Sequence, residues 1–419
     1  MKGLTHMKKL LILLTIALFL PAAAHAEELR GVWVASVGNI DYPSKAAADA
    51  DTLCSEADAV LDNCAELGLN AVFLQVRPMC DALYPSKYFP VSAYLTGKQG
   101  LAPSGDSDIF AYWVDAAHSR GIELHAWINP YRVSNTPSPV LSADNPAKKH
   151  PEWTVRSNNS VWLDPGLPEV REYILSGIDE LLKGYKLDGI HFDDYFYPSG
   201  EFDDSKSYSE YGSGMDKGDW RRSNTEDLIR RAGELCRAAH VRFGVSPCGI
   251  WANSSDIENG SATHGVSAYF DMYADTLGWA QKNLIDYIAP QIYWENGHDK
   301  ADYKTLCDWW SDKLRESNTD LYIGLADYKI SDDGSSPWFE GNEIEKQMEM
   351  NAQNDVIKGE IHFSYSTIMK NTPLLERIKS IYANTPTAEP AQEKAVRKSE
   401  RLSELLDIAL RLLLTLSVS

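Results

Sequence analysis

The amino-acid sequence predicts an α/β fold, a (β/α)8 TIM barrel followed by a C-terminal linker and helix. Eight hydrophobic runs rich in β-branched and aromatic residues recur along the chain, and helix-like segments separate most of them. Polar residues also gather where several of these runs end. A chain of 419 residues with 44% hydrophobic content is long enough for such a barrel, which takes about 250 residues or more. An open doubly wound sheet would rarely need eight such units.

The predicted strands and helices alternate in the order that parallel strands with crossover helices require. The strand-like runs begin at Arg30, Asn70, Ile122, Asp188, Phe243, Tyr287, Leu321 and Glu360. The helix-like segments span residues 53–67, 109–119, 170–182, 226–239, 274–284 and 344–353.

The run DGIHFDDYFYP, residues 188–198, ends in two carboxylates and an aromatic loop. Side chains alternate between the faces of a strand, so His191 and Asp193 share one face while Ile190 and Phe192 share the other. The apolar face meets the surrounding helices, and the polar face lines the end of the barrel where such folds carry their sites. Asp193 is therefore predicted at the barrel mouth.

The same alternation gives a polar face to three further runs. The side chains on those faces are Gln75 and Arg77 in the second run, His125, Trp127 and Asn129 in the third, and Gln291, Tyr293 and Glu295 in the sixth. If these faces converge, the mouth presents Arg77, Asn129, Asp193 and Glu295 beside several aromatic rings. Such a set suits a carbohydrate, because sugars offer C–H faces for stacking and hydroxyls for polar contacts.

The net charge indicates which partners are excluded, and the N-terminus indicates the compartment. The net charge of −20 argues against a nucleic-acid or anionic-membrane partner, because binding to phosphate relies on clustered Lys and Arg. Lys8 and Lys9 precede an apolar run over 10–20, and Ala24-His25-Ala26 offers small residues for cleavage. We therefore expect residues 1–26 to be a signal peptide, the protein to be periplasmic or secreted, and no stable membrane span to remain after cleavage.

Two further segments follow from composition. Residues 27–383 are predicted to form the barrel domain, and residues 384–419 a polar, proline-bearing linker followed by an apolar helix. Self-contact of that helix with the barrel is favoured over contact with a partner, because apolar stripes usually find a surface of their own chain.

The motifs taken together carry a family resemblance. RGVWVASVGNIDYPS, LQVRPMCDALYPSKYFPVSAYLTGKQG, GIELHAWINPYRV, DGIHFDDYFYP and IAPQIYW occur in this order. The chain resembles, over about residues 29 to 383, the glycosyl-hydrolase-like family formerly called domain of unknown function 187, also called glycosyl hydrolase family 10-like. The resemblance implies a (β/α)8 glycosidase, and some members act on the glycan strands of peptidoglycan. A polysaccharide or glycan strand is thus the expected substrate.

The catalytic roles are assigned from physical chemistry. Glycoside hydrolysis usually needs two carboxyl groups, about 5 Å apart for retention of configuration and roughly 6.5 to 9.5 Å apart for inversion. Asp193 and Glu295 are the predicted pair, with Glu295 as the general acid and Asp193 as the nucleophile, base or orienting anion. Asp194 is either a supporting catalytic residue or a loop cap that points away, and Asp327 is a reserve acid whose alternation counts against it.

A second mechanism stays open. DGIHFDDY loosely resembles the DGxDxDxE strand of chitinase-like enzymes, in which an aspartate orients the N-acetyl group of the substrate. His191 replaces the first inner aspartate of that pattern and Tyr195 stands at the position of the acid. Substrate assistance would then require an acid from elsewhere, with Glu295 as the candidate.

The remaining candidates are predicted to bind substrate, each against a structural alternative. Arg77 would bind the substrate or pair with an acid. The histidines would bind the substrate or a metal ion, with core hydrogen bonding as the favoured alternative, and the aromatic residues would stack on sugars or fill the barrel. The substrate-binding set is Arg77, His125, Asn129, His191, Tyr195, Gln291, Tyr293 and Trp294. No cofactor and no metal is predicted, since the first run lacks the His-x-His of metal-dependent hydrolase barrels. A catalytically silent carbohydrate-binding barrel is the competing hypothesis.

Overall fold

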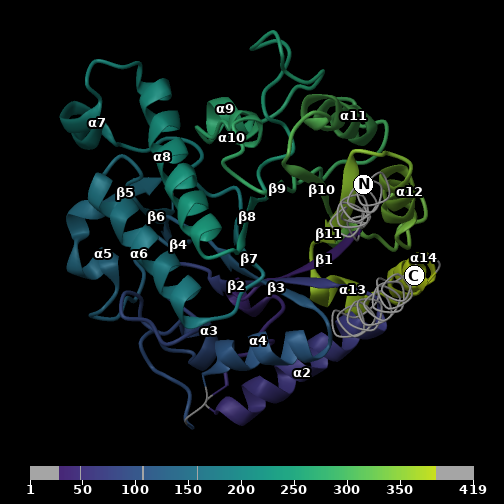
Figure 1. Ribbon diagram of the computed structural model, residues 1–419, viewed down its shortest axis with the longest axis horizontal. Helices are drawn as coiled ribbons and strands as arrows, with labels where there is room; N and C mark the ends of the chain where they lie inside the picture. Colours follow the sequence, from purple (N-terminus) through teal and green to yellow (C-terminus); the bar gives the residue numbers. More distant parts are fainter. Residues whose placement is uncertain (1–27, 48, 106–107, 158, 384–419) are drawn as a thin grey trace, which may run out of the picture.

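The computed structural model describes residues 28–47, 49–105, 108–157 and 159–383, and its centre is a closed barrel of parallel strands (Figure 1). The strands are β1 (Leu29–Val34), β2 (Ala71–Arg77), β3 (Glu123–Ile128), β7 (Gly189–Phe192), β8 (Arg242–Val245), β9 (Tyr287–Ile288), β10 (Asp320–Leu325) and β11 (Ile357–His362). Their order around the barrel is β1-β11-β10-β9-β8-β7-β3-β2. Each overlaps one of the eight predicted runs, so the predicted fold class is confirmed. The predicted signal peptide and the predicted linker and terminal helix lie outside the described residues.

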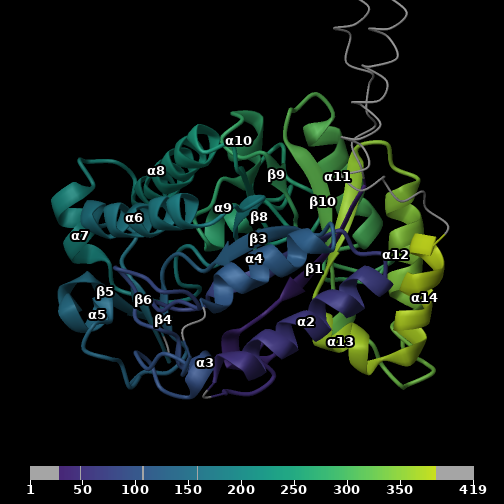
Figure 2. The ribbon, with the colours of Figure 1, turned by 60° about the horizontal axis from the view of Figure 1, so that its bottom comes forward.

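Helices surround this barrel (Figures 1 and 2). The longer ones are α2 (Ala50–Glu66), α4 (Ile109–Ser119), α6 (Pro168–Gly184), α8 (Lys217–Ala238), α11 (Tyr303–Leu314), α12 (Asn342–Ala352) and α14 (Thr372–Ala383). The shorter ones are α3 (Ala93–Thr96), α5 (Pro146–Lys149), α7 (Ser205–Tyr211), α9 (Ala268–Asp271), α10 (Thr276–Gln281) and α13 (Tyr365–Lys370), with 3-10 turns at Val37–Asn39, Pro151–Trp153 and Asp327–Lys329. The six helix-like segments of the sequence overlap α2, α4, α6, α8, α10 and α12. No helix of the described residues is long and apolar enough to cross a membrane.

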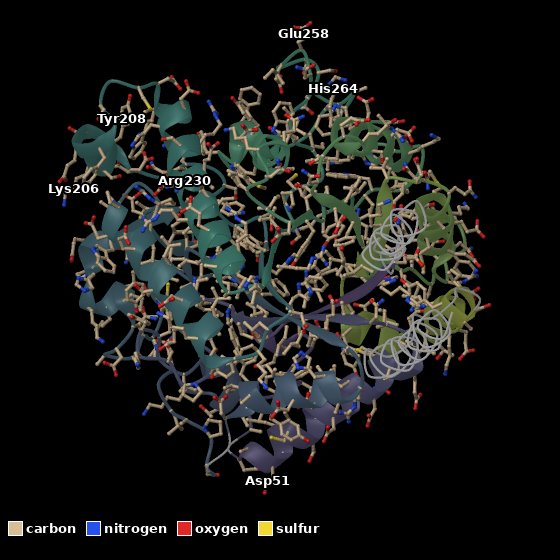
Figure 3. All side chains as sticks on the ribbon, viewed as in Figure 1. Asp51, Lys206, Tyr208, Arg230, Glu258 and His264 are labelled. Carbon is tan, nitrogen blue, oxygen red and sulfur yellow. The ribbon has the colours of Figure 1, made fainter. Side chains whose placement is uncertain are left out.

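Local sequence explains where these helices start and which side they bury. The Asp49 side chain accepts a hydrogen bond from Thr52 N before α2, and Asp108 accepts two before α4, which satisfies backbone N–H groups at each helix start. The buried residues of α2 recur with helical spacing. They are Ala50, Leu53, Ala57, Val60, Leu61 and Cys64. This apolar side packs on the barrel, while charged residues such as Asp51, Lys206 and Glu258 lie at the periphery (Figure 3).

The barrel interior is filled by large rings, and glycines make room for them. Trp33, Phe73, Trp127 and Tyr287 belong to one buried cluster inside the barrel. A Cβ atom on Gly189 of β7 would lie 2.1 Å from Nδ1 of His125, which is a distance that no packed structure tolerates. The absence of a side chain at this position therefore allows the histidine ring to lie inside the barrel.

A small antiparallel sheet is inserted between β3 and α6. Its strands are β4 (Arg132–Ser134), β5 (Thr154–Ser157) and β6 (Ser160–Leu163), in the order β4-β6-β5. The strands and helices predicted from the sequence did not include this sheet. Because β4 begins four residues after β3 ends, the sheet stands next to the carboxyl ends of the barrel strands.

Candidate active site

Asp193 follows the last residue of β7 and is almost completely buried, with 2% of its surface exposed. Its Oδ2 accepts a hydrogen bond from Trp127 Nε1 at 3.0 Å and another from the side-chain amide of Asn129. Its Oδ1 accepts the backbone N–H of Tyr195 at 3.2 Å. The structure therefore brings together Asp193, Asn129 and Trp127, which the alternation of side chains placed on one face of the barrel.

Asp194 also faces this cluster instead of pointing away. Its Oδ1 accepts a hydrogen bond from Nε2 of Gln291 at 3.3 Å, and the same amide nitrogen donates to the backbone oxygen of Ser246 at 2.8 Å. Regular strand geometry ends at Phe192, so the alternation that applies to β7 does not extend to Asp194. Asp194 is half-buried, whereas Asp193 is buried. The two consecutive carboxyls thus differ in access while remaining side by side.

The two carboxyls titrate as a pair. Burial, and next the charge of Asp194, raise the pKa of Asp193 to about 7, while Arg132 opposes the rise. Burial also raises the pKa of Asp194. Two close carboxylates resist double ionisation, so the pair retains a proton in a pH range where isolated carboxyls have lost theirs. A proton available near neutral pH is what a general acid requires.

Aromatic rings flank the acids on two sides. Tyr195 is 41% exposed and lies 6.0 Å from the ring of Trp162, with the guanidinium of Arg132 4.6 Å from its centroid. Tyr293 lies 5.7 Å from Tyr328, which is 50% exposed. These rings give the site apolar faces of the kind that stack on sugars. Trp294, also a substrate-binding candidate, is half-buried, and its carbonyl accepts a hydrogen bond from Gln347.

The two histidines lie deeper in the barrel than the acids. Tyr287 Oη joins them, at 2.9 Å from Nδ1 of His125 and 3.1 Å from Nδ1 of His191. His191 Nε2 lies within hydrogen-bond distance of Ser246 Oγ and Trp33 Nε1. Both rings are fully buried, and burial lowers the pKa of His191 well below its usual range. Their contacts match the core hydrogen-bonding alternative for these residues.

Arg77 does not lie at the mouth with the acids. The pairing of β2 with β3 shifts between Gln75 and Arg77, and this irregularity turns the Arg77 side chain outward. Its guanidinium lies 4.4 Å from the ring of Phe89, and its Nη1 is next to Gly177 of α6. Its expected position beside Asp193 is therefore corrected: Arg77 is buried between the barrel and the helices.

Glu295 is also placed differently from the expectation. The strand β9 comprises only Tyr287–Ile288, so Glu295 stands in the loop beyond it and not at the end of a regular strand. It is half-buried, and it makes no hydrogen bond or ion pair with Asp193 or Asp194 in the described structure. The reserve acid Asp327 is fully buried and accepts Nδ1 of His362 at 3.0 Å, which places it in a separate network.

Sequence reasoning did not single out Arg132, Trp162 or Tyr328 as site residues. Arg132 stands in the quoted motif GIELHAWINPYRV, but its approach to Asn129 depends on a turn after β3 that no alternation of side chains describes. Trp162 pairs with Arg132 across the inserted sheet. The sequence signal that could have pointed to Arg132 was its place in a polar and aromatic motif directly after a predicted strand.

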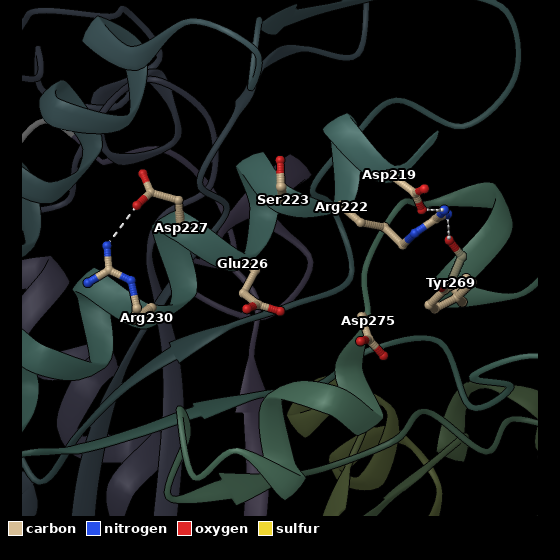
Figure 4. Close-up of a pocket in the computed structure, with 8 residues that line it drawn as sticks. All are labelled: Asp219, Arg222, Ser223, Glu226, Asp227, Arg230, Tyr269 and Asp275. Carbon is tan, nitrogen blue, oxygen red and sulfur yellow. Dashed lines mark hydrogen bonds and ion pairs between the residues drawn. The ribbon is translucent and has the colours of Figure 1, made fainter. Parts of the chain in front are cut away.

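A cavity of about 360 Å³ opens elsewhere on the surface, along α8 (Figure 4). Most of its charged lining residues are paired: Arg222 with Asp219 at 2.6 Å, Arg230 with Asp227 at 2.8 Å, and Glu226 at 2.6 Å with Lys282, which lies outside the lining. It contains neither acid of the pair. Across the described ranges, no group of three or more His, Cys, Asp or Glu is arranged to hold a metal ion.

Comparison with known proteins places this site in context. The model of the family described as glycosyl hydrolase-like 10 matches residues 28–340. The chain is 43% identical over 377 residues to glycosyl hydrolase YngK of Bacillus subtilis (strain 168), covering 86% of this chain and 73% of that protein. It is 38% identical over 366 residues to glycosyl hydrolase DigH of Escherichia coli (strain K12), covering 81% of this chain and 83% of that protein.

A solved structure supports the fold alone. The glycoside hydrolase domain of PgaB (BpsB) from Bordetella bronchiseptica superimposes with a TM-score of 0.52 at 13% sequence identity. The match covers 86% of this chain and 99% of that domain.

Proposed function

Since the chain belongs to the glycosyl hydrolase-like 10 family, we propose that it hydrolyses O-glycosidic bonds and that Asp193 and Asp194 form its catalytic centre. The observation that carries the proposal is the pair of adjacent carboxyls after β7, one buried and one accessible, whose pKa values are raised. Such a pair provides both a proton donor and a negative charge near neutral pH.

The contacts indicate which carboxyl holds the proton. Asp193 accepts N–H groups from Trp127, Asn129 and Tyr195, and hydrogen-bond donors stabilise a carboxylate. Asp194 accepts one longer bond from Gln291 and is more exposed. Burial and the charge of Asp194 act the other way, since they raise the pKa of Asp193. Three N–H donors on Asp193 against a single longer bond on Asp194 outweigh this effect, so we place the charge on Asp193 and the proton on Asp194. In this assignment Asp194 is the general acid that protonates the leaving oxygen of the glycosidic bond.

The second half of the reaction has two candidate routes. In the two-carboxylate route Glu295 attacks the anomeric carbon or activates a water molecule. In the substrate-assisted route the N-acetyl oxygen of the sugar attacks, and the Asp193 anion stabilises the positive charge that develops. A Glu295→Ala variant separates them, because azide can replace a missing nucleophilic or basic carboxylate. Rescue by azide supports the first route, and near-normal activity without azide supports the second.

The proposed substrate is a bacterial cell-wall glycan, namely the glycan strands of peptidoglycan, or a related polysaccharide. This follows from the sequence resemblance together with the exposed Tyr195 and Tyr328 beside the acids. The proposed compartment is periplasmic or secreted, which rests on the signal sequence expected at residues 1–26. The polysaccharide would then meet the enzyme outside the cytoplasm.

Incubation with intact and peptide-free peptidoglycan tests this function. Protein beginning at Glu27 and its Asp194→Asn variant are compared, and the released sugar ends are identified by mass spectrometry. New reducing ends from the wild type alone support hydrolysis. Binding of the glycan by both proteins without any released ends would instead identify a catalytically silent carbohydrate-binding barrel.

A further inference from the structure

The side-chain amide of Asn129 is held from both ends. Its Oδ1 accepts Nε2 of Gln75 at 2.7 Å and Nη2 of Arg132 at 2.6 Å, while its Nδ2 donates to Oδ2 of Asp193. If the amide were flipped, its NH2 group would face two N–H donors and its oxygen would face a carboxylate. The contacts of Gln75 and Arg132 therefore permit a single orientation, the one that donates to Asp193.

The two residues that hold Asn129 are themselves fixed. Gln75 is fully buried, and its Oε1 accepts the backbone N–H groups of Ser36 and Val37 at 3.0 and 2.9 Å. Its NH2 group must consequently point toward Asn129. Arg132 is 5% exposed and donates from Nε and Nη2 to the carbonyl of Pro78 at 3.1 and 3.0 Å. Backbone atoms thus set the direction of both donors.

We infer that Gln75 and Arg132 are positioning residues, which act on the acid pair by holding the amide of Asn129 in the one orientation that donates to Asp193. Neither residue forms a hydrogen bond with Asp193 or Asp194. The catalytic meaning of this arrangement rests on the proposed function, because that proposal makes the two carboxyls the reacting groups. The arrangement itself depends only on the buried hydrogen bonds.

Arg132 has a second effect through its charge. The titratable or charged groups that act electrostatically on the pair from neighbouring elements are Arg132, Tyr195, Cys248 and Tyr293. Tyr195 and Cys248 have pKa values raised to about 12, and the pKa of Tyr293 lies well above its usual range, so these three are neutral at pH 7. Arg132 is the cation of this set. Its single charge balances a pair that carries one proton.

The two effects predict different titrations. The bond from Asn129 stabilises the Asp193 anion, which exists after the first proton of the pair is lost and persists after the second. Losing that bond therefore raises the pKa of the first titration step and leaves the pKa of the second step unchanged. The positive charge of Arg132 stabilises the anion formed in each step, so losing this charge raises the pKa values of both titration steps.

Direct titration of the carboxyls tests the inference without requiring turnover. Protein labelled with ¹³C at the aspartate carboxyls is titrated by NMR, with Asp193→Asn and Asp194→Asn used to assign the two signals. Gln75→Leu should raise the first step by about 1 pH unit and leave the second in place. Arg132→Gln should raise both steps by about 1 pH unit or more, whereas Arg132→Lys should keep the second step near the wild-type value. Gln99→Leu, which removes a half-buried amide outside this cluster, is the matched control and should move neither step.

Folding is checked for each variant by thermal unfolding. If Gln75→Leu does not fold, Asn129→Leu removes the same donation to Asp193 at its source and must raise the first step. Unchanged titration steps in a folded Gln75→Leu or Asn129→Leu protein would overturn the inference. Shifted steps in a protein that never hydrolyses a glycan would leave the positioning intact and refute the proposed function, so the two failures are distinguishable.

Where turnover is measurable, the pH profile of kcat/KM provides a second readout. The acidic limb should move upward in Gln75→Leu while the alkaline limb stays in place, because the alkaline limb reports loss of the proton from Asp194. A rise in KM with both limbs unchanged would show that Gln75 serves substrate binding instead.

Discussion

The indole N–H of Trp127 donates to the Asp193 carboxyl at 3.0 Å across the adjacent strands β3 and β7. The indole is 6% exposed, so it excludes water from this oxygen while replacing the hydrogen bond that water would make. All three contacts of Asp193 are N–H donors, and this requirement distinguishes a carboxylate from an amide of the same shape.

Asp193→Asn should therefore abolish activity without unfolding the protein. An asparagine must turn its NH2 group toward at least one of the three donors, and it carries no charge. The expected loss in rate is on the order of 10² or more. Turnover of a verified substrate and far-UV circular dichroism check this; near-wild-type turnover by the folded variant would remove Asp193 from the mechanism.

Asp194→Asn should affect substrates according to their leaving groups. A poor leaving group depends on protonation, so its cleavage should slow by about 10² to 10⁴. An activated aryl glycoside leaves with little help and should retain much more of its rate. Kinetics with both substrate types provide the comparison. Equal losses on the two substrates would assign Asp194 to binding or structure, and the acid would then be sought at Glu295.

Glu360 should make stability fall as pH rises. It is 3% exposed, accepts Tyr382 Oη at 2.9 Å, and burial raises its pKa to about 7. The folded state thus binds more protons than the unfolded state. The contribution of the protonated Glu360 carboxyl to folding stability is therefore fully present below the unfolded pKa and is lost as pH rises through about 7. Urea unfolding measures the free energy of unfolding at pH 5 and at pH 8. Between these values it should fall less in Glu360→Gln than in the wild type, by on the order of 1 to 3 kcal/mol.

The exposed carboxyl of Asp299 provides the control for this experiment. Asp299→Asn should show the wild-type slope of stability against pH. A Glu360→Gln protein with that same slope would mean that the carboxyl is ionised in the folded state throughout.

Gly189→Ala should destabilise the barrel, because the added methyl group would overlap His125, which Tyr287 holds in place. Overpacking of this kind costs about 1 to 3 kcal/mol or more. Gly184 at the end of α6 has no heavy atom within 4 Å of an added Cβ, so Gly184→Ala should leave stability unchanged or raise it by up to about 1 kcal/mol. Urea midpoints of the two variants measure the difference, and similar midpoints would contradict the packing argument.

Export should yield a mature protein that begins at Glu27. The basic residues, apolar run and Ala24-His25-Ala26 of the N-terminus supply the reason. N-terminal sequencing of the native exported fraction checks it. Finding Met1 or Met7 there would exclude cleavage.

The eight recurring runs predicted the barrel, and the alternation of side chains predicted part of its site, because the alternation holds wherever strands are regular. It placed His125 and Asn129 on the inner face of β3 and Asp193 with them. It failed for Arg77, where an irregularity in the pairing with β3 interrupts the alternation. It also does not extend to Glu295, which lies seven residues beyond the end of a two-residue strand. Loop conformation after a strand depends on tertiary contacts that a period of two does not encode.

The inserted β4-β6-β5 sheet makes the site partly independent of the barrel. Arg132 and Trp162 face each other in its register, so one small unit supplies both the cation beside the acid pair and a ring beside Tyr195. Under the proposed function, the strength of the acid and the shape of the surface that would contact the sugar are then inherited together. Exchange of this sheet between relatives would therefore shift working pH and substrate range in a single step, while the barrel strands remain as they are.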